Sequence, residues 1–491
     1  MAADSKRLKI EPINRDQLLL RPVDVEKLVP EDDSVRAIWA LTGQMDLGVF
    51  YDAVESYAGE AGREAIDPRL MISIWVYAYS MGVSSAREIS RLMEYHPGLQ
   101  WLSGMREINH HTLSDFRIAH QKALDELFTQ VLGVLSHQGL VTMERVMQDG
   151  TKIQAQAASH SFHREKHLKE HLRLAQEQVA RMGDPRAAAE VSPRLHAARQ
   201  RAAREKQARL EQAIKELDQV RSTTRKEAED VRVSTSDPAA RVMRQSKGGF
   251  APSYNVQVMT DATAGAIVDI HVIQEGSDGG QAIPGLKRLE NRMGRRLKQL
   301  VTDSGYVSHE TIRQTQEREV DFIAPVGLPK GAWGSWARRG IDPTFGSDAF
   351  TYDAQTDTMI CPNHQRMSRF RKNGTRSYTA IYYRAEPTAC GACPWREKCS
   401  PHQAARTVVR SQVHPVIAAW RRRMESPEVK NLYKQRSAVA EFANAWIKDK
   451  LKLRQFRLRG RGKTQTEMLW AGLTYNIQLW IRKVWRVPIG T

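Results

Sequence analysis

The sequence predicts an α/β protein whose main domain is a mixed sheet with flanking helices. Strand-like stretches rich in apolar and β-branched residues lie at 144–154, 254–261, 265–273 and 297–303. The two middle stretches flank a turn-like connection and so form a hairpin, and a helical pattern at 278–296 precedes the last stretch. An early strand, a hairpin, a helix and a further strand make a mixed sheet covered by helices.

The length and charge of the chain restrict its class. At 491 residues it is long enough for a real core and for roughly two to four domains. It has 74 Lys and Arg against 56 Asp and Glu, a net charge of +18 and a pI of about 9.8. This excess predicts a polyanionic partner, either nucleic acid or an anionic membrane. The sequence shows no lipidation signal, no basic and then apolar leader and no 18-residue apolar run, so we expect DNA or RNA and no membrane.

Helices are expected before the sheet. Residues 1–34 are polar, and 35–140 have the pattern of a helical domain. Asp67 offers an N-cap, Pro68 suits the first helical position, and 71–81 is apolar nearly all round, as in a buried helix. Short helices with tight turns are compatible with a DNA-reading helix-turn-helix, and a plain helical domain fits equally well.

A charged helical segment interrupts the sheet domain. The domain is divided into 141–162 and 233–325, and the intervening 163–232 carries apolar residues in alternating steps of four and three. This pattern predicts an antiparallel helical hairpin with a coiled-coil seam. The seam residues are Leu168, Leu172, Ala175, Val179 and Met182, then Leu210, Ala213, Leu217 and Val220. The hairpin is a candidate for contact with DNA or with a second copy of the chain.

Three acidic residues are the candidates for catalysis. Asp149 and Asp303 each close an apolar run, which predicts a position at a strand end, and small residues follow each of them. Glu441 lies in the C-terminal part, 413–491, which has a helical pattern. Hard cations take carboxylate oxygens, so this set could hold two Mg²⁺ ions that clamp the two oxygens of a phosphodiester displacement. The alternative is that each Asp caps the next element and Glu441 is a solvated helix residue.

The residues around Glu441 bring in a family resemblance. Tyr433, Arg436, Glu441 and Lys448 resemble the Tyr-Arg-Glu-Lys signature of bacterial insertion-sequence transposases of the DDE class. Six residues separate Glu441 from Lys448, as the signature requires, but four separate Arg436 from Glu441 where the usual signature has three.

Further blocks resemble the same family in the same order. Asp149-Gly150-Thr151-Lys152 and Asp303-Ser304-Gly305-Tyr306 look like the blocks that carry its first and second aspartates. Gly248-Gly249-Phe250 with Tyr254-Asn255-Val256-Gln257 resembles a block between them, and the stretch 35–120 resembles the family's amino-terminal domain.

The resemblance implies an RNase H-like catalytic core that binds two divalent ions, Mg²⁺ or Mn²⁺. Asp149 would bridge both ions, and Asp303 and Glu441 would each support one. Water would cleave a phosphodiester at the transposon end, and the freed 3′-hydroxyl would attack target DNA. The implied partner is double-stranded DNA, both transposon ends and target, and a homodimer is expected because two ends must be paired.

The resemblance also implies DNA contacts for the other signature residues. Arg436 and Lys448 would contact phosphates near the cleaved end, and Tyr433 would hydrogen-bond a phosphate or stack on a base. A basic run follows the presumed catalytic helix, and we expect it to contact phosphates with strong salt dependence. Its members are Arg454, Arg457, Arg459, Arg461 and Lys463. The alternative for all of them is a helix surface with ordinary charges.

All four cysteines fall in the segment 326–412, for which we expect an irregular backbone. They are Cys361, Cys390, Cys393 and Cys399. A Cys-x₂-Cys pair with two further cysteines fits a closed tetrahedral zinc site of structural role. Free thiols or a redox pair are the alternative, and His364 or His402 could replace one ligand. Clustered cysteines also suit a reducing compartment, so we expect a cytoplasmic, nucleoid-associated protein.

These observations favour a transposase that cleaves the ends of its own element and joins them to target DNA. Two other functions stay open. The first is a non-catalytic zinc-containing DNA-binding regulator or an inactive transposase relic. The second is an RNase H-like nuclease without strand transfer.

Overall fold

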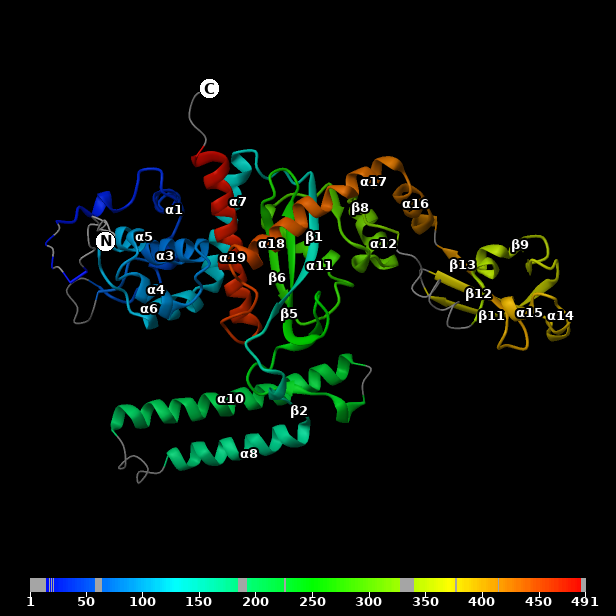
Figure 1. Cartoon of the computed structure of the whole chain (residues 1–491), viewed down its shortest axis with the longest axis horizontal. Coiled ribbons are helices and arrows are strands. Elements are labelled where there is room, and N and C mark those ends of the chain that lie inside the picture. The colour runs from blue at the N-terminus through cyan, green and yellow to red at the C-terminus, as the bar shows by residue number, and fades with distance from the viewer. Residues whose placement is uncertain are drawn as a thin grey trace, which may run out of the picture.

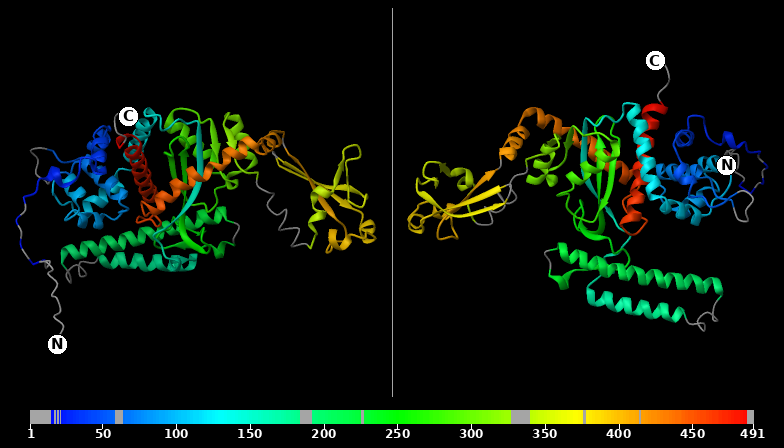
Figure 2. Two further views of the ribbon diagram at one scale, coloured as in Figure 1. Left: turned by 45° about the horizontal axis from the view of Figure 1, so that its top comes forward. Right: turned by 180° about the vertical axis from the view of Figure 1, so that it is seen from behind.

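The computed structural model describes residues 15–486 apart from 17, 19, 21, 58–63, 184–191, 225–226, 327–339, 376–377 and 414. The chain forms a central sheet with helices, a helical part on one side of it, a projecting helix pair and a separate small lobe (Figures 1 and 2). None of the described helices has both the length and the apolar character needed to cross a membrane.

The central sheet is mixed, as the sequence predicts. Its strands are β1 (Arg145–Gln154), β4 (Arg241–Arg244), β5 (Phe250–Asp261), β6 (Ile267–Ile273), β7 (Gln299–Val301) and β8 (Asp321–Ile323). The order is β4-β5-β1-β7-β8, with β6 also paired to β5. Strand β1 is antiparallel to β5 and parallel to β7, so it is the central strand where the two pairing modes meet. The α/β, RNase H-like mixed sheet expected from the sequence is therefore present.

The amino-terminal helices pack against the sheet domain through one shared core. These helices are α1 (Ser34–Thr42), α2 (Gly48–Tyr51), α3 (Pro68–Ser80), α4 (Ala86–Leu92), α5 (Pro97–Ser103), α6 (His110–Ala119) and α7 (Gln121–His137). The side chain of Asp67 accepts a hydrogen bond from the backbone N–H of Arg69 at 2.8 Å, which confirms the predicted cap of α3. Helix α19 (Arg461–Trp480) lies between the two parts, and its Trp470 ring is 6.2 Å from the ring of Trp75 in α3.

The other helices of the sheet domain cover its faces and lead to the active-site region. They are α11 (Ala282–Met293), α12 (His309–Glu317), α16 (Pro415–Met424), α17 (Pro427–Lys434) and α18 (Phe442–Asp449). A π-helical turn, η7 (Ser437–Glu441), joins α17 to α18, and a second one, η8 (Ile481–Trp485), follows α19. Short 3₁₀ turns are η1 (Val25–Leu28), η2 (Ser159–Ser161), η3 (Ala228–Asp230), η4 (Ser304–Tyr306), η5 (Pro343–Phe345) and η6 (Ser347–Ala349).

The predicted helical hairpin is present as an arm that projects from the sheet domain (Figure 1). It consists of α8 (Glu165–Met182) and α10 (Pro193–Thr223), and the short strands β2 (Phe162–His163) and β3 (Val233–Ser234) close its base. The arm has a small core of its own made of Leu168, Ala213, Leu217, Val231 and Val233.

The cysteine-containing segment is not irregular, so that prediction is wrong. It forms an antiparallel sheet in the order β13-β12-β11-β10-β9, with two short helices. The elements are β9 (Thr351–Asp353), β10 (Thr358–Ile360), β11 (Arg366–Thr375), β12 (Tyr378–Ala385), α14 (Pro387–Gly391), α15 (Arg396–Cys399) and β13 (Thr407–Val413). An antiparallel sheet with one solvated face carries polar residues at alternate positions. Because of the charged residues on the outer face of β11, the sequence pattern did not reveal the apolar positions that pack inward.

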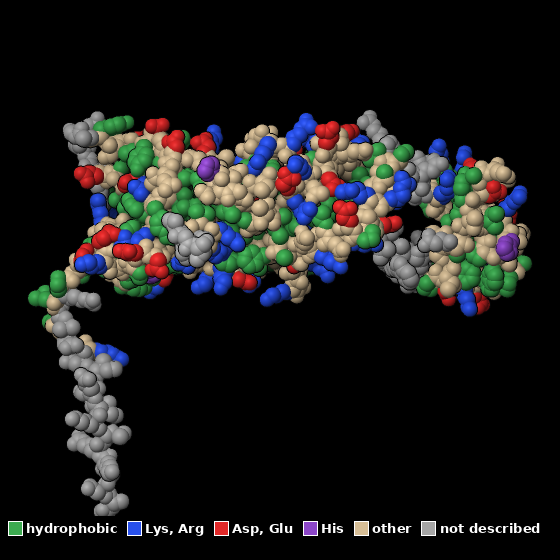
Figure 3. Space-filling model, turned by 90° about the horizontal axis from the view of Figure 1, so that it is seen from above, with side chains coloured by type: hydrophobic (Ala, Val, Ile, Leu, Met, Phe, Trp, Pro, Cys, Tyr) green, Lys and Arg blue, Asp and Glu red, His purple; other side chains and the backbone are tan. Residues whose placement is uncertain are grey.

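This segment forms a lobe with its own core, separate from the main one. Its buried apolar residues include Met367, Ile381 and Tyr383, and none of them belongs to the cluster that fills the sheet domain. The lobe lies beyond α16 (Figure 1) and forms the right-hand end of the molecule seen from above (Figure 3). We refer to the residues from Ile341 to Val413 as the cysteine lobe.

Candidate active site

Asp149 lies in the middle of strand β1, not at its end as the sequence suggested. The strand continues to Gln154 because β5 pairs with it residue by residue as far as Ser253. The Asp149 side chain is 18% exposed. A carboxylate in the middle of the central strand has little freedom to move, so its neighbours determine what it can bind.

Asp303 lies near Asp149, just beyond the end of the neighbouring strand. Strands β1 and β7 are parallel, and their pairing ends where Met147 lies opposite Val301. Asp303 follows Val301 by two residues, and its negative charge acts on the Asp149 carboxyl. The carboxylate of Asp303 also accepts a hydrogen bond from the N–H of Gly305 at 2.7 Å, so it caps the following turn as well.

Arg436 and Asn444 hold the carboxylate of Asp149 from the other side. A guanidinium Nη2 of Arg436 donates to Oδ1 of Asp149 at 2.7 Å, and the amide Nδ2 of Asn444 donates to Oδ2 at 2.8 Å. The other guanidinium nitrogen, Nη1, lies 3.7 Å from Oε1 of Glu441. The Arg436 side chain is only 10% exposed, so its charge lies inside the site between two carboxylates.

The π-helical turn explains the unusual spacing of Arg436 and Glu441. In an α-helix, residues three or four apart lie on one face, whereas a π-helical turn pairs residues five apart. Glu441 is five positions after Arg436 and ends the turn η7. The extra residue is therefore absorbed by the wider turn, and the Glu441 side chain, which is 61% exposed, still faces Arg436.

The electrostatics of the site follow from this crowding. Burial raises the pKa of the Asp149 carboxyl, Arg436 opposes the increase, and the negative charge of Asp303 adds to it. A cation close to Asp149 and Asp303 would relieve their repulsion. The three acids predicted from the sequence thus come from β1, the residues just after β7 and the end of η7. Arg436 lies between Asp149 and Glu441, and Asp303 lies near Asp149.

Asp278 is a fourth carboxylate in the site that the sequence analysis missed. Its Oδ1 accepts hydrogen bonds from Nδ2 of Asn255 at 2.8 Å and from Nε2 of Gln257 at 2.7 Å. It touches the backbone of β1 at Gly150, where an added Cβ would lie 2.0 Å from Oδ1 of Asp278. Its charge also contributes to the raised pKa of Asp149.

The polar residues that support Asp278 were also missed. The hydroxyl of Tyr306 donates to Oε1 of Gln257 at 2.6 Å, which ties the block after Asp303 to strand β5. A signal was available, since Asn255 and Gln257 are polar side chains that alternate with the apolar Val256 and Val258 in a strand whose residues are buried from Pro252 onward. Buried amides require partners, and a loop aspartate supplies one.

Lys448 and Tyr433 line the approach to the acids. Lys448 is close enough to Asp149, Arg454 and Lys152 for their charges to act on it, and burial lowers the pKa of its ammonium group. Tyr433 is half-buried, and burial raises its pKa. Their predicted DNA contacts stay predictions.

The basic run after α18 is exposed and is tied to the end of β1. The N–H of Gln154 donates to the carbonyl of Arg454 at 3.1 Å, and the N–H of Phe456 donates to the carbonyl of Gln154 at 2.9 Å. The buried Glu467 accepts from the N–H groups of Arg457 and Leu458, both at 3.1 Å. These bonds fix the backbone, and the side chains of Arg454, Arg457, Arg459, Arg461 and Lys463 face solvent.

Comparisons with known proteins identify the family. Residues 360–480 match the family described as "Transposase DDE domain", and this range contains Glu441 and all four cysteines. Residues 23–119 match the family described as "Transposase domain (DUF772)", which covers most of the amino-terminal helices. The two matches indicate a DDE transposase of an insertion sequence.

Other comparisons add little. No curated protein sequence matches this transposase significantly. A cryo-EM structure titled "piggyBac transposase synaptic complex with hairpin DNA" matches with 9% identity over 95% of this chain and 82% of that chain, at a TM-score of 0.21. Similarity at that level supports no conclusion about this transposase.

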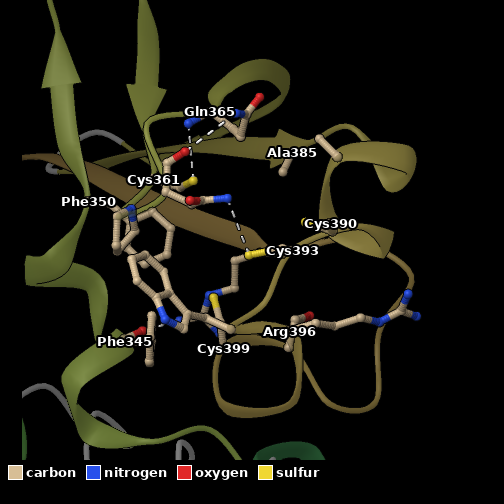
Figure 4. Close-up of a pocket in the computed structure, with 15 residues that line it drawn as sticks. Phe345, Phe350, Cys361, Gln365, Ala385, Cys390, Cys393, Arg396 and Cys399 are labelled. Atoms are coloured by element: carbon tan, nitrogen blue, oxygen red, sulfur yellow. Dashed lines mark hydrogen bonds between the residues drawn. The ribbon is translucent and has the colours of Figure 1, made fainter.

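The four cysteines of the transposase line one cavity of about 30 Å³ in the cysteine lobe (Figure 4). The N–H of Gln365 donates to Sγ of Cys361 at 3.4 Å, and Nδ2 of Asn363 donates to Sγ of Cys393 at 3.6 Å. Burial raises the pKa of the Cys399 thiol to about 11, and the other three cysteines act in the same direction while Arg406 opposes them. One cavity thus brings together Cys361, Cys390, Cys393 and Cys399.

Both candidate metal sites have suitable donors. DDE transposase domains generally use a divalent metal. Carboxylate oxygens suit Mg²⁺ or Mn²⁺, and four thiols with N–H groups donating to sulfur suit Zn²⁺. Among the residues that the structure describes, however, no three His, Cys, Asp or Glu side chains are arranged to hold a metal ion as they stand. In the acidic site, Arg436 occupies the space between two of the donors.

Proposed function

We propose that this transposase cleaves double-stranded DNA at the ends of its own element and joins the freed ends to target DNA, with Asp149, Asp303 and Glu441 as the catalytic carboxylates. One observation carries the proposal. A buried arginine contacts Asp149 and faces Glu441, and the charge of Asp303 acts on Asp149, so acids from distant parts of the chain lie close together. Such a concentration of carboxylates costs stability, and it is expected where a cation is bound.

Each residue of the site has a part that follows from its position. Asn444 fixes the orientation of the Asp149 carboxylate, and Asp303 lies just after β7, close enough for its charge to act on Asp149. Arg436 neutralises Asp149 and Glu441 while no cation is bound. Two Mg²⁺ or Mn²⁺ ions held by the three acids would stabilise the negative charge that develops on the phosphoryl oxygens. Lys448 and Tyr433 are placed to contact the DNA beside the scissile phosphate.

The remaining parts of the proposal concern assembly and substrate. We infer that the basic run from Arg454 to Lys463 contacts DNA phosphates and that the cysteines hold a structural Zn²⁺ ion. Two element ends are most simply paired by a homodimer, and a chromosomal substrate would place the protein at the nucleoid. A regulator or inactive relic is the second candidate, because the acids as they stand do not form a metal site. A nuclease that cleaves without joining is the third.

The test is cleavage of a supercoiled plasmid that carries the gene with its native flanks. We expect breaks at the flanks with Mg²⁺, none with EDTA, and none with Asp149→Asn, which keeps the side-chain size but removes the charge. Asp218→Asn, on the exposed surface of α10, serves as the matched control and should cleave like the wild type. DNA binding without any cleavage by the wild type would instead favour the regulator or relic. Cleavage without joined products would favour the nuclease.

A further inference from the structure

A hollow lies between the projecting helix pair and the catalytic domain. It measures about 710 Å³, and α10 forms one wall with Arg209 while the segment before α19 and the first turn of α19 form the other with Arg457, Arg459 and Lys463. A second hollow of about 330 Å³ shares Arg209 and Arg459 and adds Lys206 of α10. Because the two hollows share lining residues on both walls, we call them together the arm groove.

The arm groove concentrates positive charge, which the buried carboxylates of Asp237 and Glu467 offset only beside Arg459 and Arg457. Five cations line it, namely Lys206, Arg209, Arg457, Arg459 and Lys463, against the single acid Glu205. Within the described part of the chain, none of these five cations forms an ion pair. Unpaired cations on two facing walls repel one another, so an anionic ligand between them would be stabilising.

Some cations elsewhere on the arm are paired. Arg173 of α8 pairs with Glu170 and with Glu177, and Arg221 of α10 pairs with Glu165 at 2.7 Å. The groove differs from the rest of the arm because its cations lie on two walls that face each other.

The arm groove is also connected to the acids of the active site. The segment that forms its second wall is hydrogen-bonded to the end of β1 at Gln154, five residues after Asp149 in the same strand. Lys448 lies close enough to Asp149, Lys152 and Arg454 for their charges to act on it, and Arg454 also pairs with Asp449. Basic side chains thus lead from Asp149 along β1 to the groove.

We propose that the arm groove binds the sugar-phosphate backbone of the DNA duplex as it leaves the active site, which makes the inserted helix pair one wall of the DNA-binding surface. This inference rests on the proposed function. Lysine and arginine side chains on two walls suit phosphates, and contacts of this kind are independent of base sequence. The groove contributes affinity and orientation, while the choice of the element ends is made elsewhere.

The test measures binding of a fluorescently labelled duplex DNA of mixed sequence by anisotropy over a series of salt concentrations. The variant is Lys206→Gln with Arg209→Gln. Each lost phosphate contact lowers the slope of log K against log salt by about 0.9, so we expect the slope to fall by roughly 2 and the affinity to fall roughly tenfold at low salt. Lys215→Gln, on the same helix but outside the groove and exposed, should leave both unchanged.

The outcomes separate this inference from the proposed function. If the double variant has the affinity and salt slope of the wild-type protein, and the wild-type protein binds and cleaves DNA, the arm groove is not a DNA-binding site. The proposed transposase reaction would then be unaffected. A wild type that binds no duplex DNA would overturn both. An altered oligomeric state with unchanged DNA binding would make the groove a contact between copies and overturn the proposal. If the double variant does not fold, Lys463→Gln on the other wall tests the loss of a phosphate contact in the groove. The slope of log K against log salt should then change by about 1.

Discussion

At the scale of single residues, the central feature of the active site is the small number of hydrogen-bond donors to the Asp149 carboxylate. Asp149 has one donor on each oxygen, Arg436 on Oδ1 and Asn444 on Oδ2. The arginine carries a charge that a bound cation would replace, whereas the asparagine is neutral and can stay. Asn444 is therefore a positioning residue for Asp149, with no charge of its own to contribute.

Replacing Asn444 with Ala should reduce plasmid cleavage by about 10- to 100-fold, as is usual when the hydrogen-bond partner of a metal-binding carboxylate is lost. The carboxylate would keep its charge but lose its orientation. Cleavage rates over a Mg²⁺ titration measure the effect, and part of the loss should be recovered at high Mg²⁺. Asn431→Ala, an exposed asparagine of α17, is the control and should behave as the wild type. Equal cleavage by Asn444→Ala would show that the orientation of Asp149 does not depend on this bond.

At the scale of elements, close packing of β1 against a loop builds the site. Gly150 follows Asp149 in β1, and the Asp278 carboxylate and the Gln257 amide occupy the space where a side chain would lie. The π-helical turn η7 acts at the same scale, since it brings Glu441 over Arg436. Both features depend on two elements meeting at a fixed distance.

Gly150→Ala should therefore disturb the site more than it disturbs the fold. The new Cβ would lie 2.0 Å from Oδ1 of Asp278, so Asp278 or the strand must move. We expect a loss of stability of about 1–3 kcal/mol from overpacking and a fall in cleavage on the order of a hundredfold from the displaced carboxylates. Thermal unfolding and plasmid cleavage measure the two effects.

Gly133→Ala provides the matched control for that substitution. Gly133 lies inside α7 with nothing within 4 Å of the added Cβ, and alanine suits a helix better than glycine. We expect it to stabilise the protein by about 0.5–1 kcal/mol with unchanged cleavage. A Gly150→Ala protein that cleaves as well as Gly133→Ala would show that Asp278 can move without cost.

At the scale of the whole molecule, the cysteine lobe is a body with a separate core. Its buried residues do not join the cluster that unites the amino-terminal helices, the sheet and α19. The lobe core is small, and four thiols border it. A structural metal ion is a common supplement to a core of that size.

We expect the purified transposase to contain about one zinc ion per chain, as measured by elemental analysis. Cys390→Ser with Cys393→Ser should remove it and make the cysteine lobe sensitive to proteases, while the main core keeps its unfolding temperature. His402→Ala should keep the zinc, since four cysteines complete the site. A zinc-free wild type with four freely reacting thiols would contradict the zinc site.

The sequence alone determined the kinds of element and the candidate acids. Hydrophobic periodicity and caps are local properties, so the helix pair, the cap of α3 and the strands of the mixed sheet could be predicted from short windows. Asp149, Asp303 and Glu441 could be singled out because short motifs surround them. The sheet of the cysteine lobe could not be predicted from the sequence, because its exposed, charged strands have no clear periodic pattern of apolar residues.

Only the tertiary structure decided which residues meet. The pairing of β1 with β7 brings the residues after β7, with Asp303 among them, close to Asp149. The path of the chain brings Arg436 and Asn444, nearly 300 positions later, onto the same carboxylate. The network of Asp278 and the arm groove arise in the same way, from elements that are distant in sequence. Local patterns depend on neighbouring residues, whereas these contacts depend on how whole elements pack, and no short stretch of the sequence contains that information.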